Sequence, residues 1–305
     1  MKDLLSMTED EFSKFINSFD AVVTDCDGVL WLGMEEIPGA LKVMHKFKEM
    51  GKKIYYVTNN STKTRVGFLD KFKKLGFNTN FEEVVCTSYL AARYVSDHVD
   101  VSKKVYVIGS EGITLELENL GFKCFGIGPD PLGTDIAEFT SKFTVEPDVG
   151  AVVVGFDEHF SYPKMMKAAS YLYNKSTVFV GTNTDEQFPL KKANVVVPGT
   201  GSFVRAIETC SNRKAFVVGK PEAYLREVLM KEADVKPSRT LMIGDRCNTD
   251  ILLGQRCGFQ TLLVLSGVTT LDEVKEWQKS KDPELLQLVP DFYAERLGAI
   301  APKMH

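Results

Sequence analysis

The sequence predicts a doubly wound α/β fold, and two observations carry this prediction. Short apolar runs alternate along the chain with segments of helical periodicity. These runs are almost continuously apolar, which is typical of parallel strands whose sheet is covered by helices on both faces. No internal repeat of roughly 20–50 residues accompanies the alternation, so a solenoid is excluded.

The expected elements follow in the order that this fold class requires. Thr8 and Glu11 have the spacing of a capping box and predict a short helix at the N-terminus. Proline near the start and glycine after the end delimit a helix over Pro38–Met50, and further helices are expected over Thr64–Leu75 and around Tyr89–Val95. The expected strands are Phe19–Thr24, Lys53–Val57, Val84–Cys86, Val105–Ile108, Val149–Val154, Val178–Val180, Phe216–Val218, Leu241–Ile243 and Leu262–Leu265.

The composition is that of a globular protein and excludes several other classes. The chain has 305 residues, 44% hydrophobic and 26% charged, which rules out wholesale disorder. The formal net charge is −4 and no basic block is present, which argues against nucleic acid as a partner. No apolar run approaches the roughly 18 residues of a membrane span, and the acidic N-terminus lacks a signal core, so we expect no membrane partner and a cytosolic protein. Six scattered cysteines without a CxxC pair predict free thiols.

Two aspartates follow the first expected core strand. That strand runs into Asp25-Cys26-Asp27-Gly28. On an extended chain, side chains at i and i+2 share a face about 6–7 Å apart, so one phosphate can lie between Asp25 and Asp27. Cys26 then points to the opposite face, which favours a buried structural thiol over redox control. A DxD pair alone could be an ordinary strand end that happens to carry two acids.

Three further strands end in polar residues. One runs into Thr58-Asn59-Asn60, whose hydroxyl and amides suit phosphoryl oxygens. Another runs into Lys220, and a third into Asp245, with Asn248 and Asp250 just beyond. Each alone could be a helix cap, a turn or a solvated lysine. Ligands of open α/β sheets bind outside the carboxyl ends of the strands, so four such ends in this order favour one shared site.

These four strand ends resemble motifs I to IV of the haloacid dehalogenase superfamily of phosphatases. The long segment between the second and third motifs resembles the large α/β (C2) cap of that superfamily. Within it, the chain is similar to the p-nitrophenylphosphatase group, which holds phosphoglycolate phosphatase and pyridoxal phosphatase. The motifs read Asp25-Cys26-Asp27-Gly28-Val29-Leu30-Trp31, Thr58-Asn59-Asn60, Gly219-Lys220-Pro221 and Gly244-Asp245-Arg246 followed by Thr249-Asp250.

The motif positions imply two nested domains. Residues 1–102 and 213–305 are expected to form a Rossmann-like catalytic core, and residues 103–212 an inserted C2 cap. Pro129, just before the segment, and Pro131 and Pro147 within it predict an irregular loop over Asp130–Val149 in the cap. Relatives with this cap often dimerise through it, so the resemblance raises a homodimer as one oligomeric state.

The resemblance implies a Mg²⁺ site. Several carboxylates beside a phosphate dianion repel one another, and a divalent cation with oxygen ligands resolves the conflict. By resemblance, Asp25 and Asp245 supply carboxylate ligands and Asp27 its backbone carbonyl. Asp250 is expected to orient the neighbouring lysine or the metal's water molecules. Asn248 is expected there too, or as a helix cap.

The resemblance also implies an aspartyl-phosphate mechanism on a small phosphate monoester. Asp25 attacks phosphorus, and Asp27 protonates the leaving oxygen and later activates water. Thr58, Asn59 and Lys220 stabilise the phosphoryl oxygens.

The predicted substrate is phosphoglycolate, with glycerol phosphate and p-nitrophenyl phosphate as further candidates. The loop Gly181–Leu190 has the length found in the phosphoglycolate branch, and Phe188 stands where the pyridoxal branch has a histidine. Phe188 is therefore expected to contact the leaving group, or else to be a residue of the cap interface. Pyridoxal phosphate is the alternative substrate. Outside hydrolysis, the alternatives are a phosphoryl-acceptor module and a phosphotransferase.

Overall fold

The computed structural model describes residues 1–133, 135–188 and 194–304, which form two compact units. The first consists of Met1–Thr58, Val66–Val85 and Lys220–His305, and the second of Asn59–Arg65 and Cys86–Gly219. The predicted cap, residues 103–212, falls inside the second unit.

A seven-stranded sheet forms the centre of the first unit. Its strands are β1 (Lys2–Asp3), β2 (Ala21–Thr24), β5 (Lys53–Thr58), β6 (Val84–Cys86), β12 (Thr240–Gly244), β13 (Gln260–Val264) and β14 (Phe292–Ala294). They lie in the order β1-β14-β13-β12-β2-β5-β6, and every pairing from β1 to β5 is parallel. All residues of β2 and β12 are buried, as expected for central strands covered on both faces. The predicted parallel α/β core is confirmed.

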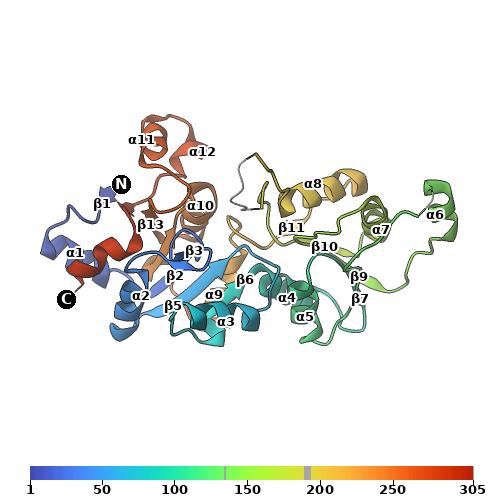
Figure 1. Cartoon of the computed structure of the whole chain (residues 1–305), viewed down its shortest axis with the longest axis horizontal. Coiled ribbons are helices and arrows are strands. Elements are labelled where there is room, and N and C mark those ends of the chain that lie inside the picture. Colours follow the sequence, from blue (N-terminus) through green and yellow to red (C-terminus); the bar gives the residue numbers. More distant parts are fainter. Residues whose placement is uncertain (134, 189–193, 305) are drawn as a thin grey trace. The chain divides into compact units, whose positions relative to one another are not determined.

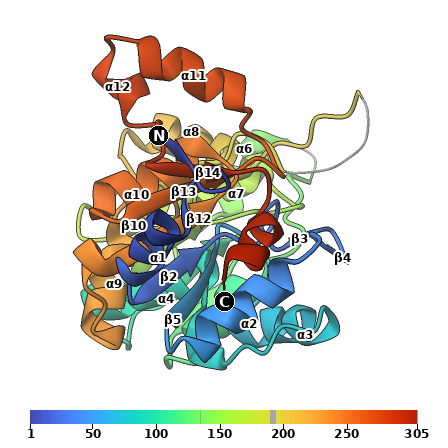
Figure 2. The same cartoon turned by 90° about the vertical axis from the view of Figure 1, so that its left-hand side faces the viewer.

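Helices and one hairpin complete the first unit. They are α1 (Glu9–Asn17), α2 (Ala40–Glu49), α3 (Arg65–Lys74), α9 (Tyr224–Ala233), α10 (Leu252–Cys257), α11 (Leu271–Lys279), α12 (Pro283–Leu286), the short helices η1 (Phe81–Glu83), η2 (Pro237–Arg239), η3 (Cys247–Ile251) and η4 (Leu297–Lys303), and the hairpin β3 (Trp31–Leu32) with β4 (Glu35–Glu36). The capping box predicted at Thr8 and Glu11 is present at the start of α1. Figure 2 shows β1 beside β14, so both ends of the chain contribute to this unit.

A second, five-stranded sheet forms the centre of the second unit. Its strands are β7 (Lys104–Ile108), β8 (Lys123–Phe125), β9 (Val149–Val154), β10 (Val178–Gly181) and β11 (Phe216–Val217), and its helices are α4 (Thr87–His98), α5 (Glu111–Glu118), α6 (Ile136–Lys142), α7 (Tyr162–Leu172) and α8 (Thr200–Ser211). The strands run parallel in the order β11-β10-β9-β7-β8. In Figure 1, α4 and α5 lie on one side of this sheet and α7 and α8 on the other.

The structure differs from the sequence prediction at several elements. The segment Asp130–Val149, predicted to be irregular, contains α6, whose first turn is capped by the Asp135 side chain accepting from the Glu138 N–H. The strand before Lys220, expected beside the other motif strands, is β11 and pairs with β10 in the second sheet. Of the helices in the described part of the chain, none combines the length and apolar character needed to cross a bilayer.

Candidate active site

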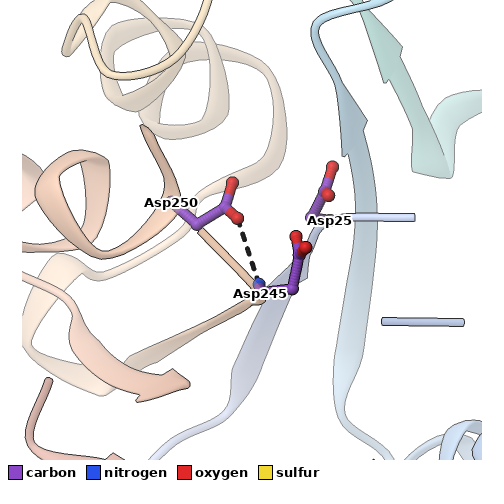
Figure 3. A group of neighbouring side chains, drawn as sticks. All are labelled: Asp25, Asp245 and Asp250. Atoms are coloured by element: carbon purple, nitrogen blue, oxygen red, sulfur yellow. Dashed lines mark hydrogen bonds between the residues drawn. The ribbon is translucent and has the colours of Figure 1, made fainter. Parts of the chain in front are cut away.

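Three aspartates meet at the carboxyl edge of the seven-stranded sheet (Figure 3). β2 and β12 are neighbours, and the Asp25 N–H donates to the Ile243 carbonyl at 2.8 Å, so Asp25 and Asp245 leave the sheet side by side. Asp250 comes from η3, and its Oδ2 accepts from the backbone N–H groups of Asp245 at 3.2 Å and Arg246 at 3.1 Å. Carboxylate oxygens of the three aspartates lie within 4.8 Å of one another.

Lys220 is the cation of this group. Its Nζ lies 2.6 Å from Asp25 Oδ1, 2.8 Å from Asp250 Oδ1 and 3.4 Å from the Val57 carbonyl. The lysine side chain is 5% exposed and that of Asp250 is 1% exposed, so the pairs are shielded from water. Burial disfavours the lysine charge, but the charges of Asp25 and Asp250 outweigh it and raise the pKa of Lys220 above its ordinary value. Lys220 is therefore a fixed cation.

One ammonium does not balance three carboxylates. Burial is the main cause that raises the pKa of Asp25 well above its ordinary value. The attraction of Lys220 lowers this pKa, and repulsion from Asp250 and Asp245 raises it further. Burial and the charge of Asp250 likewise raise the pKa of Asp245 to about 6. A bound divalent cation would favour the ionised forms, and clustered carboxylate oxygens are the ligands that Mg²⁺ prefers. The residues present therefore fit a magnesium ion.

Two glycines admit the Asp245 carboxylate. A Cβ atom on Gly28, whose φ is +86°, would lie 2.5 Å from Asp245 Oδ2, and one on Gly267 would lie 1.8 Å from it. The Val268 N–H also donates to this oxygen at 2.9 Å. The sequence interpretation missed Gly267 and Val268, although a predicted strand ends at Leu265 just before them.

Asp27 has its own set of contacts. Its Oδ1 accepts from the Trp31 indole Nε1 at 2.9 Å and from Lys71 Nζ at 3.4 Å, and its side chain is 57% exposed. The sequence interpretation did not anticipate Lys71. Cys26, between the two aspartates, is 2% exposed, as predicted. Burial, followed by the charges of Asp25 and Asp27, raises the pKa of its thiol well above the ordinary value, which disfavours the reactive thiolate.

Two further predicted residues belong to the first unit. Thr58 ends β5 and is buried at the same edge of the sheet. Asn248 lies in η3 and is exposed. The N-cap of η3 is Arg246, so the helix-cap role predicted as one option for Asn248 is wrong.

The other predicted residues belong to the second unit. The Asn59 amide donates to Asp185 Oδ1 at 3.2 Å, a partner that the sequence interpretation missed. Asn60 Oδ1 accepts from the backbone N–H two residues further on at 2.8 Å, which forms a local turn. The Phe188 ring packs against Phe156, with 4.4 Å between ring centroids. Positions 189 and 190 of the predicted specificity loop lie outside the described residues.

Comparison with known proteins identifies the family. The model of the haloacid dehalogenase-like hydrolases matches residues 22–123, and that of the HAD-hydrolase-like group matches residues 217–295. Human glycerol-3-phosphate phosphatase is 40% identical over 292 residues, covering 93% of this chain and 91% of that protein. The chain belongs to the haloacid dehalogenase-like hydrolases.

Other members of the family cover the chain as fully. Phosphoglycolate phosphatase 1A, chloroplastic, of Arabidopsis thaliana is 40% identical, covering 95% of this chain and 79% of that protein. The solved p-nitrophenyl phosphatase of Archaeoglobus fulgidus superposes with a TM-score of 0.75 at 25% identity, covering 93% of this chain and 99% of that one. The predicted family, the fold class and the enzyme class, a phosphoric monoester hydrolase, are thus confirmed.

Proposed function

We propose that this haloacid dehalogenase-like hydrolase cleaves small phosphate monoesters with Mg²⁺, and that phosphoglycolate and glycerol phosphate are its first candidate substrates. The observation that carries the proposal is the group of three aspartates, two of them buried, around the buried Lys220 at the carboxyl edge of the sheet. The two relatives named for these substrates, each 40% identical, support the choice of ester.

The ion would be held by Asp25 and Asp245 through their carboxylates and by Asp27 through its carbonyl. When bound, Mg²⁺ offsets the excess negative charge of the site and of the phosphate. Asp250 has two tasks: it pairs with Lys220 and fixes the backbone at Asp245. Asn248, which is exposed in η3, is assigned to orient the water molecules of the metal ion.

In the first step, an oxygen of Asp25 attacks phosphorus in line and the ester P–O bond breaks. Asp27 gives its proton to the departing oxygen. Lys220 holds a negative phosphoryl oxygen, assisted by the hydroxyl of Thr58 and by Asn59. Asp27, now ionised, takes a proton from a water molecule that attacks the aspartyl-phosphate. Inorganic phosphate leaves and Asp25 is regenerated.

The domain assignment is part of the proposal. Residues 1–102 and 213–305 act as the catalytic core, and residues 103–212 act as a cap that excludes bulk water and contacts the leaving group. Phe188 and Asn60 are assigned to substrate binding. A homodimer formed through the cap and a cytosolic location stay predictions.

A panel of small phosphate esters tests the function. We expect Mg²⁺-dependent release of free phosphate, with kcat/KM higher for phosphoglycolate or glycerol phosphate than for pyridoxal phosphate. Chelation of divalent cations should abolish turnover, and Mg²⁺ should restore it. A long-lived phosphoprotein without phosphate release would identify a phosphoryl acceptor, and transfer to an added alcohol without hydrolysis would identify a phosphotransferase.

A further inference from the structure

Asp27 is held by one oxygen. Both of its side-chain donors, Trp31 Nε1 at 2.9 Å and Lys71 Nζ at 3.4 Å, converge on Oδ1. Within the described residues, no side chain or backbone group donates to Oδ2. The two oxygens of this carboxylate therefore have different surroundings, although the residue is 57% exposed and could otherwise rotate freely.

Trp31 is a rigid donor. Its side chain is 1% exposed, and its ring makes edge contacts with Phe72 at 4.9 Å and Phe77 at 5.7 Å between centroids. The backbone fixes the same residue, because the Gly28 N–H donates to the Trp31 carbonyl at 2.8 Å and closes the loop that follows Asp27. The indole N–H therefore reaches Asp27 from a position that packing and backbone both define.

Lys71 is held in turn by the tryptophan. Its Nζ lies 4.4 Å from the centroid of the Trp31 ring, within cation–π range, and its side chain is only 18% exposed. The three side chains thus form a closed triangle of ring, cation and carboxylate. A lysine that only extended from α3 into solvent would not contact both the Trp31 ring and the Asp27 carboxylate.

We propose that Trp31 and Lys71 are positioning residues that clamp Oδ1 of Asp27, so that Oδ2 is the oxygen that exchanges the proton with the leaving group. The inference rests on the proposed function, in which Asp27 is the general acid. Ester cleavage then transfers the Oδ2 proton to the departing oxygen while Oδ1 stays bound to the indole and the ammonium. A misoriented acid should slow only those reactions whose leaving group must be protonated.

Leaving-group dependence tests the clamp. Glycerol phosphate releases an alkoxide that needs a proton, whereas p-nitrophenyl phosphate releases a stable phenolate that does not. We expect Trp31→Phe, which keeps a ring but removes the donor, to lower kcat/KM for glycerol phosphate about 10–100-fold and for p-nitrophenyl phosphate less than about 3-fold. Lys71→Gln should give the same selectivity with a smaller loss, and Lys71→Arg should restore most of it.

Two matched variants separate the possible outcomes. Lys73→Gln removes the charge of an exposed lysine in the same helix α3 and leaves both donors to Asp27 in place, so it should change kcat/KM for neither ester. Equal losses on both esters for Trp31→Phe and Lys71→Gln, or no loss on either, would overturn the clamp. Lys71→Gln decides the matter if Trp31→Phe does not fold. Asp27→Asn tests the underlying function separately. If this variant keeps its activity on glycerol phosphate, Asp27 is not the general acid. If Asp27→Asn loses activity selectively on glycerol phosphate while Trp31→Phe and Lys71→Gln do not, only the clamp is rejected.

Discussion

Each unit of the protein buries a lysine against aspartate, but the two groups differ in charge balance. In the second unit, Lys164 and Asp157 form a pair with a 2.5 Å contact and side-chain exposures of 0% and 2%. One cation meets one anion, and the other Asp157 oxygen accepts from the His159 N–H at 2.8 Å. In the first unit, Lys220 meets Asp25 and Asp250, with Asp245 beside them.

The difference distinguishes a structural ion pair from a reactive site. The Lys164–Asp157 pair is complete, because its charges cancel and its oxygens have donors. The group around Lys220 carries excess negative charge, and this excess raises the pKa values of Asp25 and Asp245. Buried charge without a counterion is costly, so the second kind of group is stable only with extra protons or with a bound cation.

Removing the nucleophile should produce the largest effect. Asp25→Asn keeps the size of the side chain but cannot form the aspartyl-phosphate, so we expect activity below about 1% of wild type. The midpoint of thermal unfolding should not fall, because one of three mutually repelling carboxylates is removed. Phosphate release and a melting curve measure the two effects.

The control for this variant lies just before the same strand. Asp20→Asn alters an exposed aspartate that pairs with Arg239, so activity should stay within about 2-fold of wild type. Residual activity of Asp25→Asn above about 1% would reject Asp25 as the nucleophile.

Breaking the balanced pair should affect stability instead of chemistry. Lys164→Met leaves Asp157 buried without its cation, so we expect a loss of about 3–5 kcal/mol in the free energy of unfolding, measured in urea. Replacing both residues with apolar ones should recover most of this loss. Lys167→Gln is the matched control, because its pair with Asp130 is about a quarter exposed and should contribute less than about 1 kcal/mol. Equal losses for the two lysines would contradict the distinction.

The unbalanced group should also respond to pH in metal-free protein. Because the folded-state pKa of Asp245, about 6, is above the ordinary 3.8, the folded protein holds an extra proton between these values. This contribution to stability is full below pH 4 and is lost as pH rises through 6. The free energy of unfolding of Asp245→Asn, relative to that of wild type, should therefore rise by about 2–3 kcal/mol between pH 4 and pH 7.

Urea unfolding at several pH values in a chelator measures this difference. Adding Mg²⁺ at pH 7 should stabilise wild type but not Asp245→Asn. If the free energies of unfolding of the two proteins change with pH in parallel, the ionisation of Asp245 does not destabilise the folded protein.

The smallest expected effect concerns the apolar surroundings of Phe188. Phe188→His should shift the ratio of kcat/KM for phosphoglycolate and pyridoxal phosphate by about 5-fold toward the latter, since one pocket contact contributes on the order of 1 kcal/mol. Phe160→Leu is the control, because Phe160 packs on Phe203 in the same aromatic group. An unchanged ratio in Phe188→His would leave Phe188 a packing residue of the cap.

The predictable part of the site lies at strand ends that the chain itself marks. Asp25 and Asp245 each follow an apolar run, and the parallel strands β2 and β12 bring their carboxyl ends to one edge. Lys220 also follows an apolar run, but its strand β11 lies in the second sheet, so a shared sheet edge does not predict its position. Lys71 and Asp185 carry no such mark, because their importance comes from contacts with residues 44 and 126 positions away. A single sequence does not state which distant segments touch.

The fold shows the same limit. The apolar run of β11 looks like any other strand of the series, and only its pairing with β10 assigns it to the second sheet. The helix α6 was missed because the surrounding prolines and glycines obscure a segment of seven residues. In both cases the local sequence pattern is compatible with more than one structure: an apolar run can join either sheet, and a segment rich in proline and glycine can be a loop or contain a short helix.

The strand order also sets when the catalytic sheet can form during synthesis. β2 pairs with β12 through Ala21 and Thr240, so one edge of β2 stays unpaired until more than two hundred further residues have been synthesised. At about 5–20 residues per second, that delay is roughly 10–40 s. The strands of the second sheet all lie between Lys104 and Val217, so they can pair while the chain is still growing. The exposed edge of β2 is then the segment that a chaperone would have to protect on the ribosome.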